Sequence, residues 1–148
     1  MKIQKVNLKK EKYLDLLYLG DENYDLIKKY LSKSDMYIAK ENEDIIGQIC
    51  IKRISGKIFE IKNISILPKY QHKGYGAKLI KFIFEMYKKK ASIMIVGTGE
   101  TKKSLNFYQS LGFKPIKIIR NYFLNNYDHE IYEDNIKLKD MIYLKKIL

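Results

Sequence analysis

At 148 residues the chain is long enough to bury a single core and too short for a second domain of ordinary size. With 46% hydrophobic and 13% aromatic residues it is not intrinsically disordered, and no apolar run approaches the roughly 18 residues of a membrane span. The N-terminal residues carry charge but lack the apolar segment of a secretory signal, so we expect a soluble, cytoplasmic protein without a membrane partner.

The net charge of +12 raises the hypothesis of nucleic-acid binding, because basic surfaces attract phosphate backbones. The excess is almost entirely lysine, since Arg53 and Arg120 are the only arginines, and the lysines are spread along the chain. We therefore interpret the charge as a solvated surface and expect no specific nucleic-acid partner.

Cysteine and histidine are too few and too scattered to predict a metal site. The one cysteine, Cys50, cannot form an internal disulfide and lies in a strand-like segment, so we expect a small buried apolar residue. Neither His72 nor His129 has a cysteine or another histidine nearby in the sequence.

The first half of the chain predicts a short strand, two amphipathic helices and three strands. The helical spacing of apolar residues is broken between the two helices by residues 20–23. In the last of these strands, residues 58–67, the alternation places Glu60 on one face with Ile64 and Ile66, and Phe59, Ile61, Asn63 and Ser65 on the other. The predicted strands are residues 1–8, 36–39, 45–53 and 58–67, and the helices centre on residues 14–18 and 26–31.

After Pro68, which ends the strand, a loop at residues 71–77 opens a long helix whose apolar stripe runs from Leu79 to Tyr87. The apolar run 93–96 is predicted to be a buried strand and residues 101–111 a helix ended by Gly112. Two closing strands, 113–124 and 136–144, flank a polar connection at residues 125–135. This order predicts an α/β fold of the α+β type, with one mixed, mostly antiparallel sheet of about seven strands and helices on both faces.

The loop places Gly74 and Gly76 in the first turn of the helix, where the N–H groups have no intrahelical partner. Without Cβ atoms a ligand can approach the backbone closely, the helix dipole favours an anion, and Lys73 adds a positive charge. The pattern therefore predicts a site for a phosphate or pyrophosphate group, although G-x-G before a helix is a weak signal by itself.

Two ordered motifs make the signal specific. The frame Gln71-x-x-Gly74-x-Gly76-Ala77 resembles the acetyl-CoA-binding signature of the GNAT acetyltransferase superfamily, and residues 105–113 resemble its following helix and strand, where a Phe-Tyr pair precedes Gly-Phe. The resemblance covers residues 36–124 in order and spacing. It implies one GNAT-like domain over residues 1–148 that moves an acetyl group from acetyl-CoA to a primary amine by direct transfer in a ternary complex, without a metal.

The same resemblance implies the cofactor contacts. Backbone groups near Ile66 and Leu67 would pair with the pantetheine arm, and one N–H would polarise the thioester carbonyl. His72 lies within the loop and is interpreted as a phosphate contact rather than a base. Glu100-Thr101 departs from the family pattern, in which an asparagine holds the pantetheine, so Thr101 is either a weaker contact or a helix cap. The full set of expected contacts is Ile66, Leu67, Gln71, His72, Lys73, Gly74, Tyr75, Gly76, Ala77, Thr101 and Tyr108.

Two residues are candidates for proton transfer. Tyr108 resembles the superfamily's general acid, which protonates the leaving thiolate; its alternative role is to pack the helix onto the sheet. Glu60 resembles a general base found in one branch, and partial burial would raise its pKa toward a useful range. Glu60 as a solvent-facing strand residue, with an ordered water as the base, remains open.

The acceptor is the least defined part. Four carboxylates, Asp128, Glu130, Glu133 and Asp134, fall in the connection that borders the acceptor site in the superfamily, so they are candidates for binding a cationic small-molecule or peptide amine; a solvated loop is the alternative. The oligomeric state is open, with a homodimer as one alternative. A non-catalytic CoA-binding module of the same fold is the alternative function.

Overall fold

The chain folds around one seven-stranded sheet with the strand order β1-β2-β3-β4-β5-β9-β6. The computed structural model describes residues 1–148. All neighbouring strands are antiparallel except β4 and β5, so the predicted mixed, mostly antiparallel sheet is confirmed. The strands are β1 (Lys2–Val6), β2 (Asp35–Glu41), β3 (Asp44–Ser55), β4 (Ile58–Ile66), β5 (Ile93–Gly99), β6 (Lys114–Ile119) and β9 (Met141–Ile147), with a separate hairpin of β7 (Tyr132–Glu133) and β8 (Ile136–Lys137).

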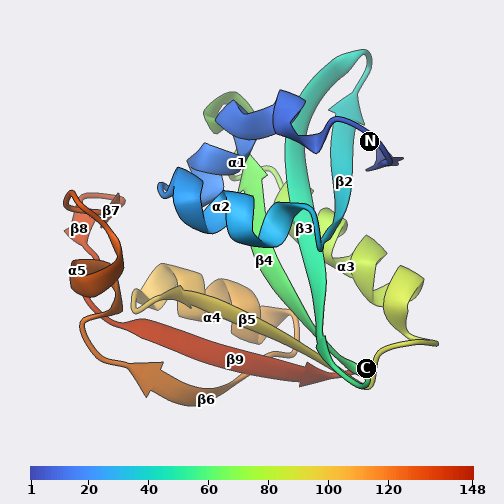
Figure 1. Cartoon of the computed structure of the whole chain (residues 1–148). Coiled ribbons are helices and arrows are strands. Elements are labelled where there is room, and N and C mark those ends of the chain that lie inside the picture. The colour runs from blue at the N-terminus through green and yellow to red at the C-terminus, as the bar shows by residue number, and fades with distance from the viewer.

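Helices cover both faces of the sheet (Figure 1). The helices α1 (Leu14–Gly20) and α2 (Tyr24–Leu31) pack on one face through a core that includes Leu17, Ile27 and Met36. On the other face α3 (Tyr75–Tyr87) and α4 (Lys102–Ser110) enclose the larger core, which includes Leu79, Ile83 and Tyr108. The remaining helical elements are α5 (Tyr122–Asn126), η1 (Lys10–Tyr13) and η2 (Pro68–Tyr70). Even the 13-residue α3 falls short of a membrane span, and no other helix has the length and apolar composition of one.

A bulge in β4 reverses the side-chain alternation expected there. Cys50 of β3 pairs with Asn63, but the next residue, Ile51, pairs with Ile61, so Lys62 is an extra residue. As a result Ile64 packs against the same core as Ile61, while Asn63 donates a hydrogen bond to the Leu17 carbonyl oxygen of α1 (2.9 Å). The predicted faces were therefore wrong: Glu60 does not share a face with Ile64 and Ile66, nor do Phe59 and Ile61 share one with Asn63 and Ser65.

The parallel pair β4–β5 is joined over only part of its length. Ile58–Ile61 pair with Ile93–Val96, and beyond these residues the two strands have no register with each other. Figure 1 shows them converging near the C-terminus of the chain and separating toward their own C-terminal ends. The second half of β4 therefore exposes one backbone edge without a neighbouring strand.

The bounds of the two predicted closing strands were wrong: 113–124 extends too far, and 136–144 begins and ends too early. Strand β6 ends at Ile119, and residues 122–126 form α5 after Asn121, which has a left-handed backbone (φ 57°). The Asp140 carboxylate fixes this turn because it accepts from the Asn121 N–H (2.7 Å). Ile136–Lys137 belong to the small hairpin, and β9 begins only at Met141. Tertiary contacts between Phe123, Ile131 and Leu138, which form their own cluster, override the strand-like local pattern.

Candidate active site

The separation of β4 from β5 leaves a cavity of about 810 Å³. Its two ends are formed by different parts of the chain. We call the end lined by Gln71, His72 and residues 74–77 the loop end. At the opposite strap end, Asp21 and Glu22 of the α1–α2 loop meet the strap, defined as residues 121–131. Between them the walls are β4 from Glu60 to Ile66, residues 96–99 of β5, and the α4 residues Lys103, Ser104, Phe107 and Tyr108.

The loop end is built by backbone geometry. Gly74 is the N-cap of α3 with φ 85°, and a Cβ atom there would meet nothing within 4 Å, so the conformation, not crowding, favours glycine. No side chain caps this helix, and the N–H groups of Tyr75, Gly76 and Ala77 have no acceptor in the protein. The Gln71 side chain donates to the Ile66 carbonyl oxygen (2.8 Å) and so ties the loop to β4. The turn therefore presents free amide donors of the kind that the sequence predicts for binding an anion.

Lysine side chains flank the loop end without occupying it. Lys73 Nζ lies 5.9 Å from the centre of the Tyr70 ring, and Lys78 Nζ lies 5.6 Å from that of Tyr75. Both charges therefore stand near the helix N-terminus, where they add to the attraction that the amides and the helix dipole exert on an anion.

The structure does not bring every predicted cofactor residue to the cavity. Leu67, Lys73 and Thr101 do not line it, whereas the other eight do. The Leu67 N–H already donates to the Ile46 carbonyl oxygen (2.8 Å), which removes it from the open edge of β4. Thr101 is the N-cap of α4: its hydroxyl accepts from the Ser104 N–H (3.1 Å) and donates to Glu133 (2.6 Å). Thr101 thus takes the helix-cap role, one of its two predicted alternatives.

Tyr108 presents a lone hydroxyl to the cavity from a buried ring. The ring packs against Phe107 and Phe113, with centroids 5.0 and 5.7 Å away, and the residue is only 7% exposed. The Tyr108 hydroxyl makes no hydrogen bond to the protein. Every side-chain oxygen that is fully shielded from solvent in this structure has a hydrogen-bond partner, so the Tyr108 hydroxyl is not shielded and must face the cavity. Burial, followed by the nearby Glu133 carboxylate, raises the pKa of Tyr108, so the phenol is protonated at neutral pH.

Glu60 is a buried carboxylate of the cavity wall, on the part of β4 that still pairs with β5. It is 8% exposed, and burial raises its pKa above the ordinary value although the Lys62 ammonium, 3.4 Å away, acts in the opposite direction. The carboxylate lies close enough to Tyr143 to contribute, after burial, to raising the pKa of that phenol to about 12. A carboxylate with a raised pKa can accept a proton near neutral pH.

At the strap end the structure reveals a carboxylate that sequence reasoning missed. Asp21 accepts hydrogen bonds from the hydroxyls of Tyr127 (2.7 Å) and Tyr30 (3.1 Å), and burial raises its pKa despite these donors. Tyr122 and Tyr143 also line this cavity, so the half-buried Asp21 carboxylate lies in an aromatic-rich part of it. Within Gly20-Asp21-Glu22-Asn23 the aspartate looked like an ordinary helix break, and no local signal pointed to its partner about a hundred residues away.

The four carboxylates predicted to bind the acceptor are already engaged. Asp128 contacts His129 (2.6 Å), Glu130 contacts Tyr132 and Lys137, and neither lines the main cavity. Glu133 and Asp134 do line it, but they lie beside the start of α4. There Glu133 accepts from Thr101 and Ser104, and Asp134 pairs with Lys103 (2.6 Å). The structure thus does not assemble the four into one free acidic surface.

The potential metal-ligating side chains of the protein do not gather at one place. No group of three or more His, Cys, Asp and Glu side chains has an arrangement suited to a metal ion. Cys50 is fully buried in the core beneath α1 and α2, as predicted, and does not line the cavity.

Comparison with known proteins agrees with this geometry. The GNAT acetyltransferase domain family matches residues 32–115. An uncharacterised N-acetyltransferase of Bacillus subtilis, YvbK, is 33% identical over 132 residues, which cover 88% of this chain and 85% of that protein.

Two solved structures are similar over nearly the whole chain. A GNAT family acetyltransferase from Elizabethkingia anophelis with acetyl-CoA bound is 34% identical with a TM-score of 0.92, and the match covers 99% of this chain and 97% of that one. A Bacillus subtilis acetyltransferase in complex with CoA is 30% identical with a TM-score of 0.90, covering 99% and 98%. The chain therefore belongs to the GNAT family and is an acetyltransferase.

Proposed function

We propose that the protein transfers an acetyl group from acetyl-CoA to a primary amine, directly and within a ternary complex. The observation that carries the proposal is the single cavity that joins the uncapped N-terminus of α3, the open edge of β4, the free Tyr108 hydroxyl and the buried Glu60 carboxylate. The relatives with acetyl-CoA and CoA in their structures support the choice of acetyl donor.

The loop end fits the phosphate groups of the donor. The N–H groups of Tyr75, Gly76 and Ala77 are free, no carboxylate stands among residues 68–78, and lysines flank the turn. The open edge of β4 between the bulge and Ile66 fits an extended pantetheine arm, which would pair with the backbone as an additional strand does. A backbone N–H on this edge is the candidate to polarise the thioester carbonyl.

Direct transfer requires the amine nitrogen to attack the thioester carbonyl carbon while the carbon–sulfur bond breaks. The leaving thiolate takes a proton, for which the Tyr108 hydroxyl is the donor, since it is protonated and has no other partner. The amine must lose a proton, and Glu60 is the acceptor, directly or through a water. The only cysteine of the chain lies outside the cavity, so no thiol is placed to form an acetyl-enzyme.

The test is acetyl-CoA-dependent release of free thiol over a panel of primary amines, combined with calorimetric titration of acetyl-CoA. We expect saturable acetyl-CoA binding and thiol release that requires both substrates, with initial-rate lines that intersect when both concentrations are varied. Parallel lines, or a burst of acetylated enzyme without amine, would contradict direct transfer. Binding without turnover of any amine would instead indicate a CoA-binding module.

A further inference from the structure

The strap crosses the cavity at the end opposite the loop end. It is anchored on the β9 side, where Asn121 N–H donates to Asp140 (2.7 Å) and Phe123 N–H donates to the Lys139 carbonyl oxygen (3.0 Å). Phe123 and Ile131 of the strap also pack with Leu138 in a small apolar cluster. One side of the strap is therefore held firmly by the β6–β9 half of the sheet.

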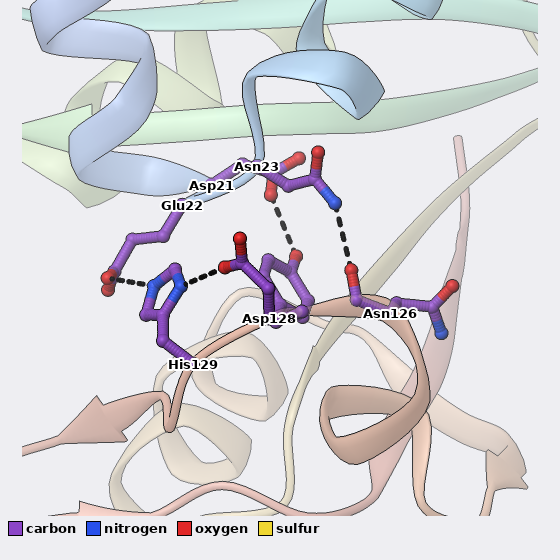
Figure 2. Close-up of polar contacts among 7 residues, drawn as sticks. Asp21, Glu22, Asn23, Asn126, Asp128 and His129 are labelled. Carbon is purple, nitrogen blue, oxygen red and sulfur yellow. Dashed lines mark hydrogen bonds and ion pairs between the residues drawn. The ribbon is translucent and has the colours of Figure 1, made fainter.

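The other side of the strap is fastened to the α1–α2 loop by three contacts, one for each of three consecutive loop residues (Figure 2). The Tyr127 hydroxyl donates to Asp21 (2.7 Å) and the Asn23 side-chain amide donates to the Asn126 carbonyl oxygen (2.8 Å). His129 lies between Asp128 (2.6 Å) and Glu22 (3.1 Å). We call this set of contacts the clasp.

The clasp joins the two halves of the separated sheet across the cavity. The clasp residues Asp21, Glu22 and Tyr127 line the cavity, and so do Tyr122 and Phe123 of the strap. The two proposed proton-transfer groups, Glu60 and Tyr108, line the same cavity as the clasp residues and the loop end. An amine that reaches them must fit in the space behind the clasp.

We infer that the clasped strap restricts the acceptor to small primary amines and excludes amines carried by a polypeptide, that is, protein N-termini and lysine side chains of proteins. The inference rests on the proposed function, because it assigns the acceptor class of the same site. While the amine of a polypeptide acceptor is bound, the rest of its chain has to extend out of the site through an open groove at the strap end. The α1–α2 loop and the strap would have to separate to form that groove. All three contacts of the clasp would then break, and the partly buried Asp21 carboxylate would lose its Tyr127 partner.

The test compares amines of the same chemistry on carriers of different size. Alanine amide is paired with a decapeptide that begins with alanine. Nα-acetyl-lysine amide is paired with an N-terminally acetylated decapeptide that has the same lysine at its centre. Tyramine and ethanolamine extend the set of small amines. We expect the best small amine to exceed every peptide in kcat/KM by at least about 50-fold. Two clasp variants, His129→Ala and the double variant Tyr127→Phe/His129→Ala, should reduce this preference by roughly 10-fold or more.

Asn125→Ala is the matched control, because this strap side chain is exposed and makes no hydrogen bond. The Asn125→Ala control should keep the wild-type preference, and circular dichroism should verify that all variants fold. If the double variant does not fold, His129→Ala still tests the inference, because it changes only an exposed side chain. The inference would be overturned if the wild type acetylated the peptides as efficiently as their small counterparts, or if the preference were unchanged in folded clasp variants. Either outcome would leave amine acetylation itself intact. Absence of turnover with every amine, despite acetyl-CoA binding, would overturn both.

Discussion

The loop end and the strap end of the cavity are built in opposite ways. The loop end is made of backbone: a left-handed Gly74, free N–H groups at the start of α3 and the open edge of β4, all within residues 62–77. The strap end is made of side chains from segments about a hundred residues apart, such as Asp21 and Tyr127. A backbone site can recognise a constant ligand in many sequences, whereas a side-chain site can change its ligand by single substitutions. We therefore expect the loop end to hold the common acetyl donor and the strap end to set the acceptor.

The largest expected effect comes from placing a charge at the loop end. Gly76→Asp puts a carboxylate beside the free amides and should weaken acetyl-CoA binding by more than about 100-fold in calorimetry, since it repels the pyrophosphate. Gly76→Ala is the matched control, because its Cβ would lie 3.5 Å from the Phe107 ring, an ordinary contact, and should bind nearly as wild type. Gly74 is less suitable, since any side chain at φ 85° is strained. Equal affinity of the Asp and Ala variants would mean that the pyrophosphate binds elsewhere.

Between the two ends, Tyr108→Phe should lower kcat by roughly 100-fold while acetyl-CoA affinity is kept, because the ring contacts with Phe107 and Phe113 survive and only the proton donor is lost. Tyr87→Phe serves as the control: it removes another buried hydroxyl, bonded to Asp35 (2.5 Å), and should reduce stability without changing kcat. A wild-type kcat in Tyr108→Phe, with chemistry shown to be rate-limiting, would reduce Tyr108 to a packing residue.

Glu60→Gln should lower kcat/KM by about 10-fold or more at neutral pH and remove the acid limb that Glu60 contributes to the pH profile, since the base must be ionised.

The same substitution should make the protein more stable at high pH. Burial raises the folded-state pKa of Glu60 above its unfolded value, so this group's stabilising contribution is complete below the unfolded pKa and is lost as the pH rises through the folded pKa. The Gln variant should therefore have a higher Tm than wild type above pH 7. A less stable and fully active variant would refute both roles.

The sequence contained enough information for the loop end because its determinants are local. A turn that needs glycines, a following helix and a preceding strand can be read from adjacent residues such as Gly74 and Gly76, and the order of elements defines the sheet. The bulge at Lys62 could not be predicted in the same way, because it depends on the register between β3 and β4. The alternation rule consequently assigned Ile64 and Asn63 to the wrong faces.

The contacts of the acidic connection and of the strap end escaped prediction for a related reason. The acidic character of residues 128–134 was visible in the sequence, but their partners were not: Lys103 for Asp134, and Thr101 and Ser104 for Glu133, come from a helix about thirty residues earlier. Asp21 drew no attention since aspartate is common where helices break. Its place in the cavity wall beside Tyr127 follows only from the tertiary contact between them.

Asp21→Asn should sharpen the division between the two ends. Removing the carboxylate charge weakens the hydrogen bonds that hold Tyr127 and Tyr30 and removes the attraction for a cationic amine, so the KM of the best amine should rise by about 5- to 10-fold with no change in acetyl-CoA affinity. The Asn amide keeps the size of the side chain and one acceptor oxygen. If acetyl-CoA affinity fell together with the amine KM, the two ends would not be separate sites.

The smallest expected effect is the pH dependence of the His129 contacts in the clasp. The hydrogen bonds to Asp128 and Glu22 raise the pKa of His129 above its ordinary value, so its stabilising contribution is complete below the unfolded pKa and is lost as the pH rises through the folded one. The Tm difference between wild type and His129→Gln should accordingly shrink from pH 6 to pH 9, and an NMR titration should place the His129 midpoint above about 6.5. In Glu22→Gln the midpoint should move down; a midpoint insensitive to Glu22 would show that this contact does not form in solution.

The most direct test of the account is a crystal structure of the protein with CoA and its best amine. We expect the pyrophosphate on the N–H groups of Tyr75, Gly76 and Ala77, the pantetheine along β4, and the sulfur within about 3.5 Å of the Tyr108 hydroxyl, with the amine between Glu60 and the clasp. A pyrophosphate bound away from the start of α3, or a sulfur beyond the reach of Tyr108, would contradict the assignment of the donor to the loop end and the acceptor to the strap end.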